Sequence, residues 1–281
     1  MYPVNMTRLS AGEYLGRSLR RWCLSGLSLT VSAYPRRAIY PWHTHEHPTL
    51  FIPLAGIHYD QTRTGAVEQP PLSVVFHPTT SAHATSVGQS GLMGINLEIT
   101  DEWLEHCQLR SCDVTVDFRL FDSTWTRFSA LQLAAACRRE NTPETEAENV
   151  AVELTGQLVR STQTTARAPR WLARAEEYLR AHYQEPVRLR KLADELGIHP
   201  VHCCRAFHRA FGCTITAYIR LLRLIEAGRL ALGEDQPLAE VAARAGFADQ
   251  AHFTRTLSRA LGITPARLRR LRQKWYSEAD E

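Results

Sequence analysis

Residues 191–212 read KLADELGIHPVHCCRAFHRAFG, and residues 240–262 read EVAARAGFADQAHFTRTLSRALG. The two stretches correspond at an offset of 49 up to the first glycine, so that Gly246 corresponds to Gly197, and at an offset of 50 after it, so that Arg255 corresponds to Arg205. The second turn therefore has one extra residue. Each stretch contains an amphipathic helix pattern, a glycine and then a second helix pattern. Such a pattern, repeated about 50 residues further along the chain, predicts two helix-turn-helix units.

The repeat places these units at about residues 189–211 and 238–261. The second helix of such a unit commonly enters the major groove of DNA. Apolar residues at helical spacing define its buried face, so the opposite face is predicted to contact DNA. The predicted DNA-binding residues are Val201, His202, Cys204, Arg205, His208 and Arg209 in the first unit and Gln250, Ala251, Thr254 and Arg255 in the second.

The side-chain types on these faces suit DNA. Arginine can bind guanine O6 and N7 with two hydrogen bonds, and glutamine can bind adenine in the same way, which favours Arg205, Gln250 and Arg255 as base readers. Arg209, Arg259 and the cluster RLRRLRQK at residues 267–274 are better placed for phosphates. The alternative is a plain helical bundle, which explains neither the matched glycines nor the charge.

The charge of the 281-residue chain is unevenly distributed. Its formal net charge is +4. Residues 171–276 hold 18 Lys and Arg against 10 Asp and Glu, a net charge of +8, whereas the other residues hold 15 against 19, a net charge of −4. A basic C-terminal third predicts a polyanionic partner for that third, namely double-stranded DNA.

A third helix is predicted between the two units, over residues 214–232, with Thr214 or Thr216 as its cap and Gly233 at its end. A continuous helix there would act as a rod that sets the distance between the two reading helices. Helices that read successive major grooves on one face of DNA lie roughly 34 Å apart. One polypeptide is therefore expected to read two adjacent parts of an asymmetric site.

The block 171–270 resembles the AraC/XylS-type transcription regulators. The resemblance is carried by LADELGIHPVHCCRAFHRAFG, LLRLIEAGRLAL and LAEVAARAGFADQAHFTRTLSRALGITPARLRR. It implies that the outward residues of both second helices contact bases. His199 stands where a capping serine is usual, so the resemblance predicts a weakly capped first reading helix. Asp249 is predicted to cap the second reading helix.

The N-terminal region is predicted to be a β-domain, and the chain to be α+β with domains at residues 1–165 and 166–281. Between residues 20 and 100, short apolar runs bounded by Gly, Pro and Ser favour a sandwich or small barrel. Two helices are predicted at 124–139 and 144–161, followed by a linker at Ser161–Pro169.

The stretches PWHTHEHPTLFIPLAG (41–56) and VVFHPTTSAH (74–83) resemble the two sequence motifs of cupin barrels. The resemblance implies that His43, His45 and His83 face one interior, where imidazoles suit a divalent transition metal. The enzyme version of the motif expects a glutamate at position 49 or 50, and this chain has Thr49 and Leu50. The predicted effector-binding residues are Tyr40, Trp42, His43, His45 and His83, and the predicted metal ligands are His43, His45 and His83.

Three interpretations of these histidines stay open: pocket-lining side chains without metal, a bound metal that is cofactor or sensed ligand, and a catalytic metal site. The sequence favours a DNA-binding regulator controlled by a small molecule or metal, with no catalytic residue. The alternative is a cupin metalloenzyme fused to a DNA-binding module. A methyl-transferring repair regulator is disfavoured, because that chemistry needs four clustered cysteines and the seven cysteines here are scattered.

Several further expectations concern partners and location. RNA polymerase and an unknown small-molecule effector are candidate partners, and a homodimer through residues 124–161 is a third. No run of 18 apolar residues and no secretory signal are found, so neither a membrane span nor export is expected. The odd number of dispersed cysteines is typical of reduced thiols in the cytoplasm.

Overall fold

The computed structural model describes residues 6–24, 26–107, 118–137, 144–163 and 169–280. It divides into two compact units, one that contains the strands and one that contains most of the C-terminal helices. This mixed architecture confirms the predicted α+β class. The centre of the predicted linker, at residues 164–168, lies outside the described residues.

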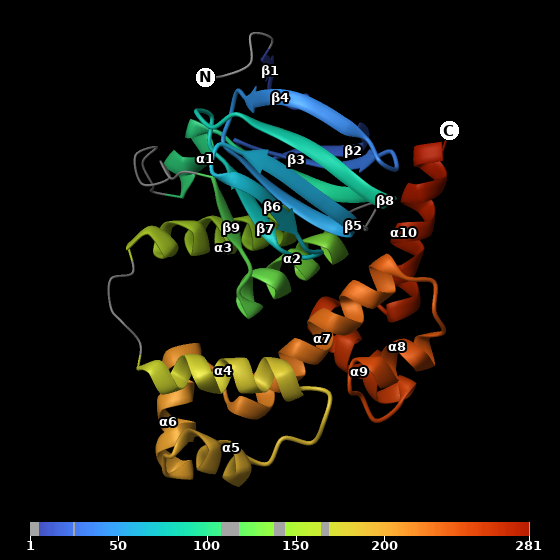
Figure 1. Ribbon diagram of the computed structural model, residues 1–281. Coiled ribbons are helices and arrows are strands. Elements are labelled where there is room, and N and C mark those ends of the chain that lie inside the picture. Colours follow the sequence, from blue (N-terminus) through green and yellow to red (C-terminus); the bar gives the residue numbers. More distant parts are fainter. Residues whose placement is uncertain (1–5, 25, 108–117, 138–143, 164–168, 281) are drawn as a thin grey trace. The chain divides into compact units, whose positions relative to one another are not determined.

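Within the described ranges, nine strands form one curled sheet (Figure 1). The strands are β1 (Thr7–Leu9), β2 (Arg17–Leu24), β3 (Leu27–Tyr34), β4 (Ile39–His45), β5 (Thr49–Thr62), β6 (Gly65–Gln69), β7 (Val74–His77), β8 (His83–Ile99) and β9 (Arg119–Phe121). The long strand β8 is central, because it pairs antiparallel with β3, β4 and β5. Strand β5 continues the sheet to β6 and β7, and β1 pairs parallel with β4.

Side chains that alternate along the strands give the sheet one apolar and one polar buried face. On β8, Ile95 and Leu97 are buried on the first face, and Asn96 is buried on the second. The Asn96 amide donates to the Ser32 hydroxyl across the β3–β8 pair at 3.0 Å, so this buried polar pair is satisfied. The polar face lines the interior cavity that is described below.

Helix α1 (Asp101–His106) follows β8, and helices α2 (Thr124–Ala136) and α3 (Glu144–Gln163) follow β9. Helix α2 begins at the predicted residue, where the Ser123 hydroxyl accepts from the Thr126 amide at 3.1 Å. It ends at Ala136, and residues 138–143 of the predicted boundary lie outside the described residues. Helices α2 and α3 pack together, with a hydrogen bond of 2.9 Å from Thr126 to Gln157.

The C-terminal region is entirely helical where it is described. Its helices are α4 (Arg170–His182), α5 (Leu189–Leu196), α6 (Pro200–Phe211), α7 (Ile215–Gly233), α8 (Leu238–Arg244), α9 (Gln250–Leu261) and α10 (Pro265–Asp280). Two helix-turn-helix units are formed by α5 with α6 and by α8 with α9. Their turn glycines, Gly197 and Gly246, have φ of 66° and 81°, a left-handed conformation that glycine adopts without a Cβ clash.

Among the described helices, none combines the length and apolar composition that crossing a membrane requires.

Candidate functional sites

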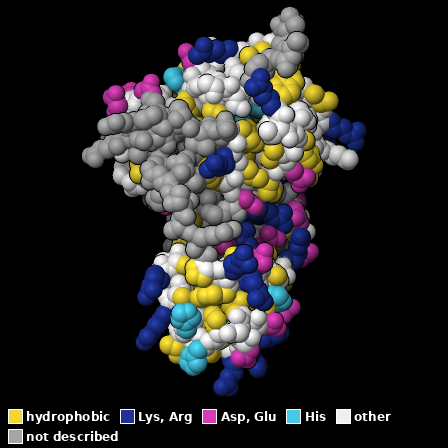
Figure 2. All heavy atoms as spheres, turned by 60° about the vertical axis from the view of Figure 1, so that its left-hand side comes forward, with side chains coloured by type: hydrophobic (Ala, Val, Ile, Leu, Met, Phe, Trp, Pro, Cys, Tyr) yellow, Lys and Arg dark blue, Asp and Glu magenta, His cyan; other side chains and the backbone are white. Residues whose placement is uncertain are grey.

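Helix α6 presents one apolar and one exposed face, as its sequence predicts. Cys203 and Phe207 are completely buried in the core of the first helix-turn-helix unit. Phe207 stacks on Phe211 and meets Tyr218 of α7 edge-on, with ring centroids at 4.3 and 5.3 Å. The six residues that the sequence assigns to DNA are all exposed: Val201, His202, Cys204, Arg205, His208 and Arg209. Figure 2 shows Lys, Arg and His side chains on a surface of the helical region.

Helix α9 has the same design. Phe253 and Leu257 are completely buried, and Phe247 of the turn packs on Phe253 with ring centroids 5.2 Å apart. Of the assigned residues, Gln250, Ala251 and Arg255 are exposed and Thr254 is half-buried. Cys203 of α6 and Leu257 of α9 are therefore part of closed, buried faces.

The two reading helices are capped by different side chains. The Asp249 carboxylate accepts from the His252 amide at 2.6 Å, which confirms the prediction of an aspartate cap for α9. In α6 the His199 ring nitrogen Nδ1 accepts from the Val201 amide at 3.3 Å. The hydrogen bond to the Asp249 carboxylate is the shorter of the two, and the carboxylate also places negative charge at the positive end of the helix. Asp249 therefore stabilises α9 more than His199 stabilises α6.

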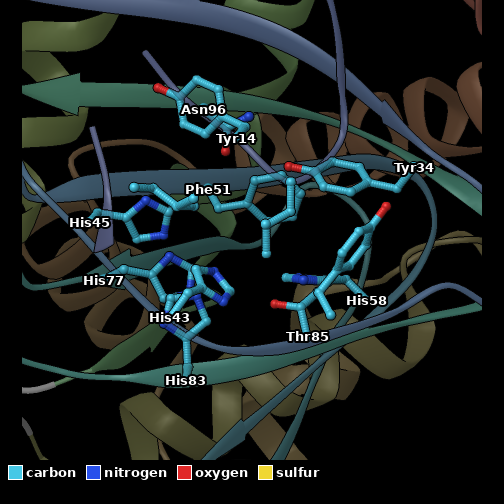
Figure 3. Close-up of a pocket in the computed structure, with 13 residues that line it drawn as sticks. Tyr14, Tyr34, His43, His45, Phe51, His58, His77, His83, Thr85 and Asn96 are labelled. Carbon is cyan, nitrogen blue, oxygen red and sulfur yellow. The ribbon is translucent and has the colours of Figure 1, made fainter. Parts of the chain in front are cut away.

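A second candidate site is a small cavity on the polar face of the sheet (Figure 3). It is lined by Leu9, Tyr14, Leu15, Tyr34, Tyr40, His43, His45, Phe51, His58, His77, His83, Thr85 and Asn96. Four of the five predicted effector residues line it, and Trp42 does not. Trp42 is adjacent to His43 on the strand and therefore points to the opposite face. A register shift between Tyr40 and His43 lets both of these side chains reach the cavity although they are three residues apart.

The predicted metal ligands come together in this cavity. His43 and His45 are alternate residues of β4, and His43 pairs directly with His83 of β8. All three are buried, and one ligand atom from each lies within 4.8 Å of the others. The ring centroids of His43 and His83 are 4.2 Å apart. His43 is oriented by its backbone, because Nδ1 lies 2.9 Å from the Pro41 carbonyl oxygen.

Three further residues of the cluster, Asp60, His58 and His77, were not assigned from the sequence. The completely buried Asp60 carboxylate accepts from His77 Nε2 at 2.7 Å and from the Thr85 hydroxyl at 2.9 Å. It also accepts from the Gln69 amide, which in turn contacts the His58 ring. The available signal was His58 and Asp60 at alternate positions of one strand, which places both on one face.

Burial and repulsion between neighbouring rings favour the neutral forms of His43, His45 and His83. Burial, with the nearby His77 and His43, lowers the pKa of His45 to about 2. Burial also lowers the pKa of His43 and, well below its ordinary value, that of His83. For Asp60, burial raises the pKa, but the nearby histidines outweigh it and hold that pKa well below its usual range. The cluster therefore offers neutral imidazoles beside a carboxylate, the protonation states in which these groups bind metals.

Comparison with known proteins shows which proteins this chain resembles. Residues 192–271 match the family described as "Helix-turn-helix domain". The probable transcription factor PqrA of Proteus vulgaris is 33% identical over 85 residues, 30% of this chain and 70% of PqrA. The regulator ExsA of Pseudomonas aeruginosa is 29% identical over 100 residues, 36% of each chain. The bifunctional transcriptional activator and DNA repair enzyme AdaA of Bacillus subtilis is 28% identical over 101 residues, 36% of this chain and 48% of AdaA.

Two solved structures are also similar. Apo ToxT K231A from Vibrio cholerae has a TM-score of 0.41 at 10% identity over 88% of this chain and 98% of that chain. The DNA-binding domain of AdpA in complex with a target DNA has a TM-score of 0.35 at 25% identity over 37% of this chain and 93% of that chain. Scores of this size add nothing to the fold argument.

The paired units, their exposed second helices and the sequence match define a DNA-binding protein of the helix-turn-helix class. The chain belongs to the AraC/XylS family of transcription regulators. The names of PqrA, ExsA and AdaA all describe transcription, as predicted, and give no support to the cupin metalloenzyme alternative.

Proposed function

We propose that this chain regulates transcription by placing α6 and α9 in the major groove of a specific double-stranded DNA site. The single observation that carries this proposal is the repeated build of the two units. Each has a second helix with a closed apolar face and an exposed face of DNA-compatible side chains. A helix that served only to fill a core would not need to be duplicated with its turn. Two helix-turn-helix units on one chain can contact a longer DNA site than one unit can.

The connecting helix α7 supports reading of two adjacent grooves. Its 19 residues correspond to about 28 Å at a rise of 1.5 Å per residue. Successive major grooves on one face of DNA lie roughly 34 Å apart, a similar length. The Thr214 hydroxyl caps this helix by accepting from the Ala217 amide at 3.2 Å. The DNA site is expected to be asymmetric, because the exposed faces of α6 and α9 carry different side chains.

The side chains divide into base readers and phosphate binders. Arg205, Gln250 and Arg255 are proposed to read bases through paired hydrogen bonds. Val201, whose side chain is 51% exposed, and Ala251 suit contact with thymine methyl groups. Arg209 is proposed to bind phosphate. The remaining proposed contacts are His202, Cys204, His208 and Thr254.

We propose that the sheet unit is a cupin-like control domain that responds to a small molecule or a metal ion. Tyr40, His43, His45 and His83 line its cavity and are the proposed effector or metal contacts. Helices α2 and α3 are the proposed contact for a second copy of the chain. RNA polymerase is the proposed further partner when the chain is bound at a promoter.

Selection of binding sites from random DNA duplexes by the full chain tests the proposal. We expect an asymmetric site with two sequence blocks whose centres lie about 10 base pairs apart. The variant Arg205→Ala is expected to relax one block and Arg255→Ala the other. Failure to enrich any sequence would refute specific DNA binding, and unchanged blocks in both variants would refute the assigned faces.

A further inference from the structure

Strand pairing brings a histidine opposite the position where the cupin-like motif lacks a ligand. The motif expects a glutamate at residue 49 or 50, and Thr49 pairs directly with His77 in the antiparallel β5–β7 register. Directly opposed residues project their side chains on the same face, with Cβ atoms about 4.5–5.5 Å apart. The Thr49 hydroxyl is already used, because it donates to the His47 carbonyl at 3.1 Å.

We propose that His77 is the fourth protein ligand of a divalent transition-metal ion held by His43, His45 and His83, and that Asp60 positions His77. The regulatory meaning of this site rests on the control domain proposed above, whose ligand class it names. Four imidazole ligands suit Zn²⁺, Co²⁺, Ni²⁺ or Cu²⁺ rather than the oxygen-preferring Mg²⁺ or Ca²⁺.

The four rings converge on one small volume (Figure 3). The His77 ring centroid lies 4.1 Å from that of His83 and 5.8 Å from that of His45. One nitrogen each of His43, His45 and His83 already lies within 4.8 Å of the others. Ligand nitrogens around a tetrahedral ion are about 3.3 Å apart when each metal–nitrogen bond is about 2.0–2.1 Å. The His77 and His83 rings are stacked with an interplanar angle of 10°, so one of them must turn about its Cβ–Cγ bond before both rings can offer a nitrogen to the same ion.

The hydrogen bonds leave the required nitrogens free. His77 donates from Nε2 to Asp60 at 2.7 Å, which leaves the lone pair on Nδ1. Among the described residues, no hydrogen-bond partner reaches the buried Nδ1 atoms of His77 and His83. His43 donates from Nδ1 to the Pro41 carbonyl and keeps the lone pair on Nε2. A buried nitrogen without a partner costs about 1–3 kcal/mol, which a coordinated ion would offset.

Asp60 has the environment of a positioning residue. Its oxygens already accept hydrogen bonds from His77, Thr85 and Gln69. A completely buried carboxylate is costly unless a positive charge lies nearby. A divalent ion on the far nitrogen of His77 would supply that charge in the carboxylate–histidine–metal arrangement that fixes ligand orientation at metal sites.

The cavity size and the ligand count favour a closed ion site. The cavity has a volume of about 30 Å³, which is enough for a single ion because one water needs about 10–15 Å³. Four protein ligands characterise structural metal sites, whereas catalytic zinc sites keep an open position for water or substrate. A fourth ligand from His77 therefore indicates a structural or regulatory metal ion in the sheet unit and not a catalytic one.

Cobalt binding to the full chain tests the proposal. Dialysed protein is loaded with Co²⁺, metal content is measured by mass spectrometry, and the visible absorption reports coordination number. We expect one Co²⁺ per chain with the strong bands of a four-coordinate ion. In His77→Cys, a thiolate would replace the imidazole and add a sulfur-to-cobalt charge-transfer band in the near ultraviolet. Asp60→Asn is expected to weaken binding about 10- to 100-fold.

His47→Ala is the matched control, because His47 lies beside β4 but outside the cluster, and it should bind Co²⁺ like the wild type. Wild-type protein that binds no Co²⁺ would overturn the site. A folded His77→Cys variant with bound Co²⁺ but no charge-transfer band would overturn the role of His77. Metal content is measured without DNA, so a chain that binds its DNA site but no metal refutes only this inference, and the reverse refutes the proposed function.

Discussion

Replacing Arg255 with alanine tests the central assignment of the reading faces. The side chain is exposed on α9, and within the described part of the chain no hydrogen bond or ion pair holds it. Its removal is therefore expected to change the free energy of unfolding by less than about 0.5 kcal/mol. At the cognate site the loss of a two-pronged guanine contact is expected to cost about 1–3 kcal/mol, which raises Kd about 5- to 140-fold.

Fluorescence anisotropy with the selected DNA site measures this loss at several salt concentrations. Arg255→Lys keeps the charge but not the planar fork, so it should lose most of the same affinity. Arg259→Ala, one turn further along α9 and also exposed, removes a predicted phosphate contact. It should weaken binding to all sequences alike and reduce the slope of log K against log salt by about 0.9.

The pattern across DNA sequences decides between the two roles. Arg255→Ala should bind the wild-type site and a site with its guanine replaced equally well, while the wild-type chain distinguishes them. If Arg255→Ala bound the cognate site as tightly as the wild type, or lost affinity equally for every sequence, then Arg255 would not read a base and the assigned face of α9 would be refuted.

The remaining predictions concern stability and are checked by urea unfolding of the full chain. Asp249→Ala should lower the free energy of unfolding by about 1 kcal/mol and Asp249→Asn by much less, because asparagine still caps α9; equal losses would refute the capping role. Gly246→Ala should cost more than Gly197→Ala, because both have positive φ but a Cβ at Gly246 would lie 2.7 Å from backbone, while that at Gly197 meets open space. Phe207→Ala should cost about 3–5 kcal/mol, and a loss below 1 kcal/mol would contradict its complete burial.

The helical region was predictable from local patterns. The period of apolar residues, the glycines at positions 197 and 246 and the aspartate at 249 each act within a few residues of the chain, so the sequence alone indicates helices, turns and caps. The exposed positions on α6 and α9 follow from the same periodicity. His199 is the exception, because its ring nitrogen caps α6 by accepting from the Val201 amide in place of a hydroxyl oxygen.

Local sequence patterns predict the residues that line the cavity only in part. His43 and His45 were paired correctly because alternate residues of one strand face the same side. Trp42 is the neighbour of His43 on β4 and therefore faces the other side of the strand, whereas the register shift between Tyr40 and His43 lets Tyr40 line the cavity as well. A bulge of this kind depends on how β4 pairs with β8, which the residues of β4 alone do not indicate.

The sequence by itself determined that the chain carries two helix-turn-helix units, which faces of their second helices are exposed, and that a histidine-rich β-region precedes them. Only the tertiary structure decided the composition of the histidine cluster. His77 and Thr49 are 28 residues apart in the chain and become neighbours only through the β5–β7 register, and Asp60 reaches His77 from the far part of β5. Pairing between distant strands is set by the packing of the whole sheet, so it leaves no local signal along the chain.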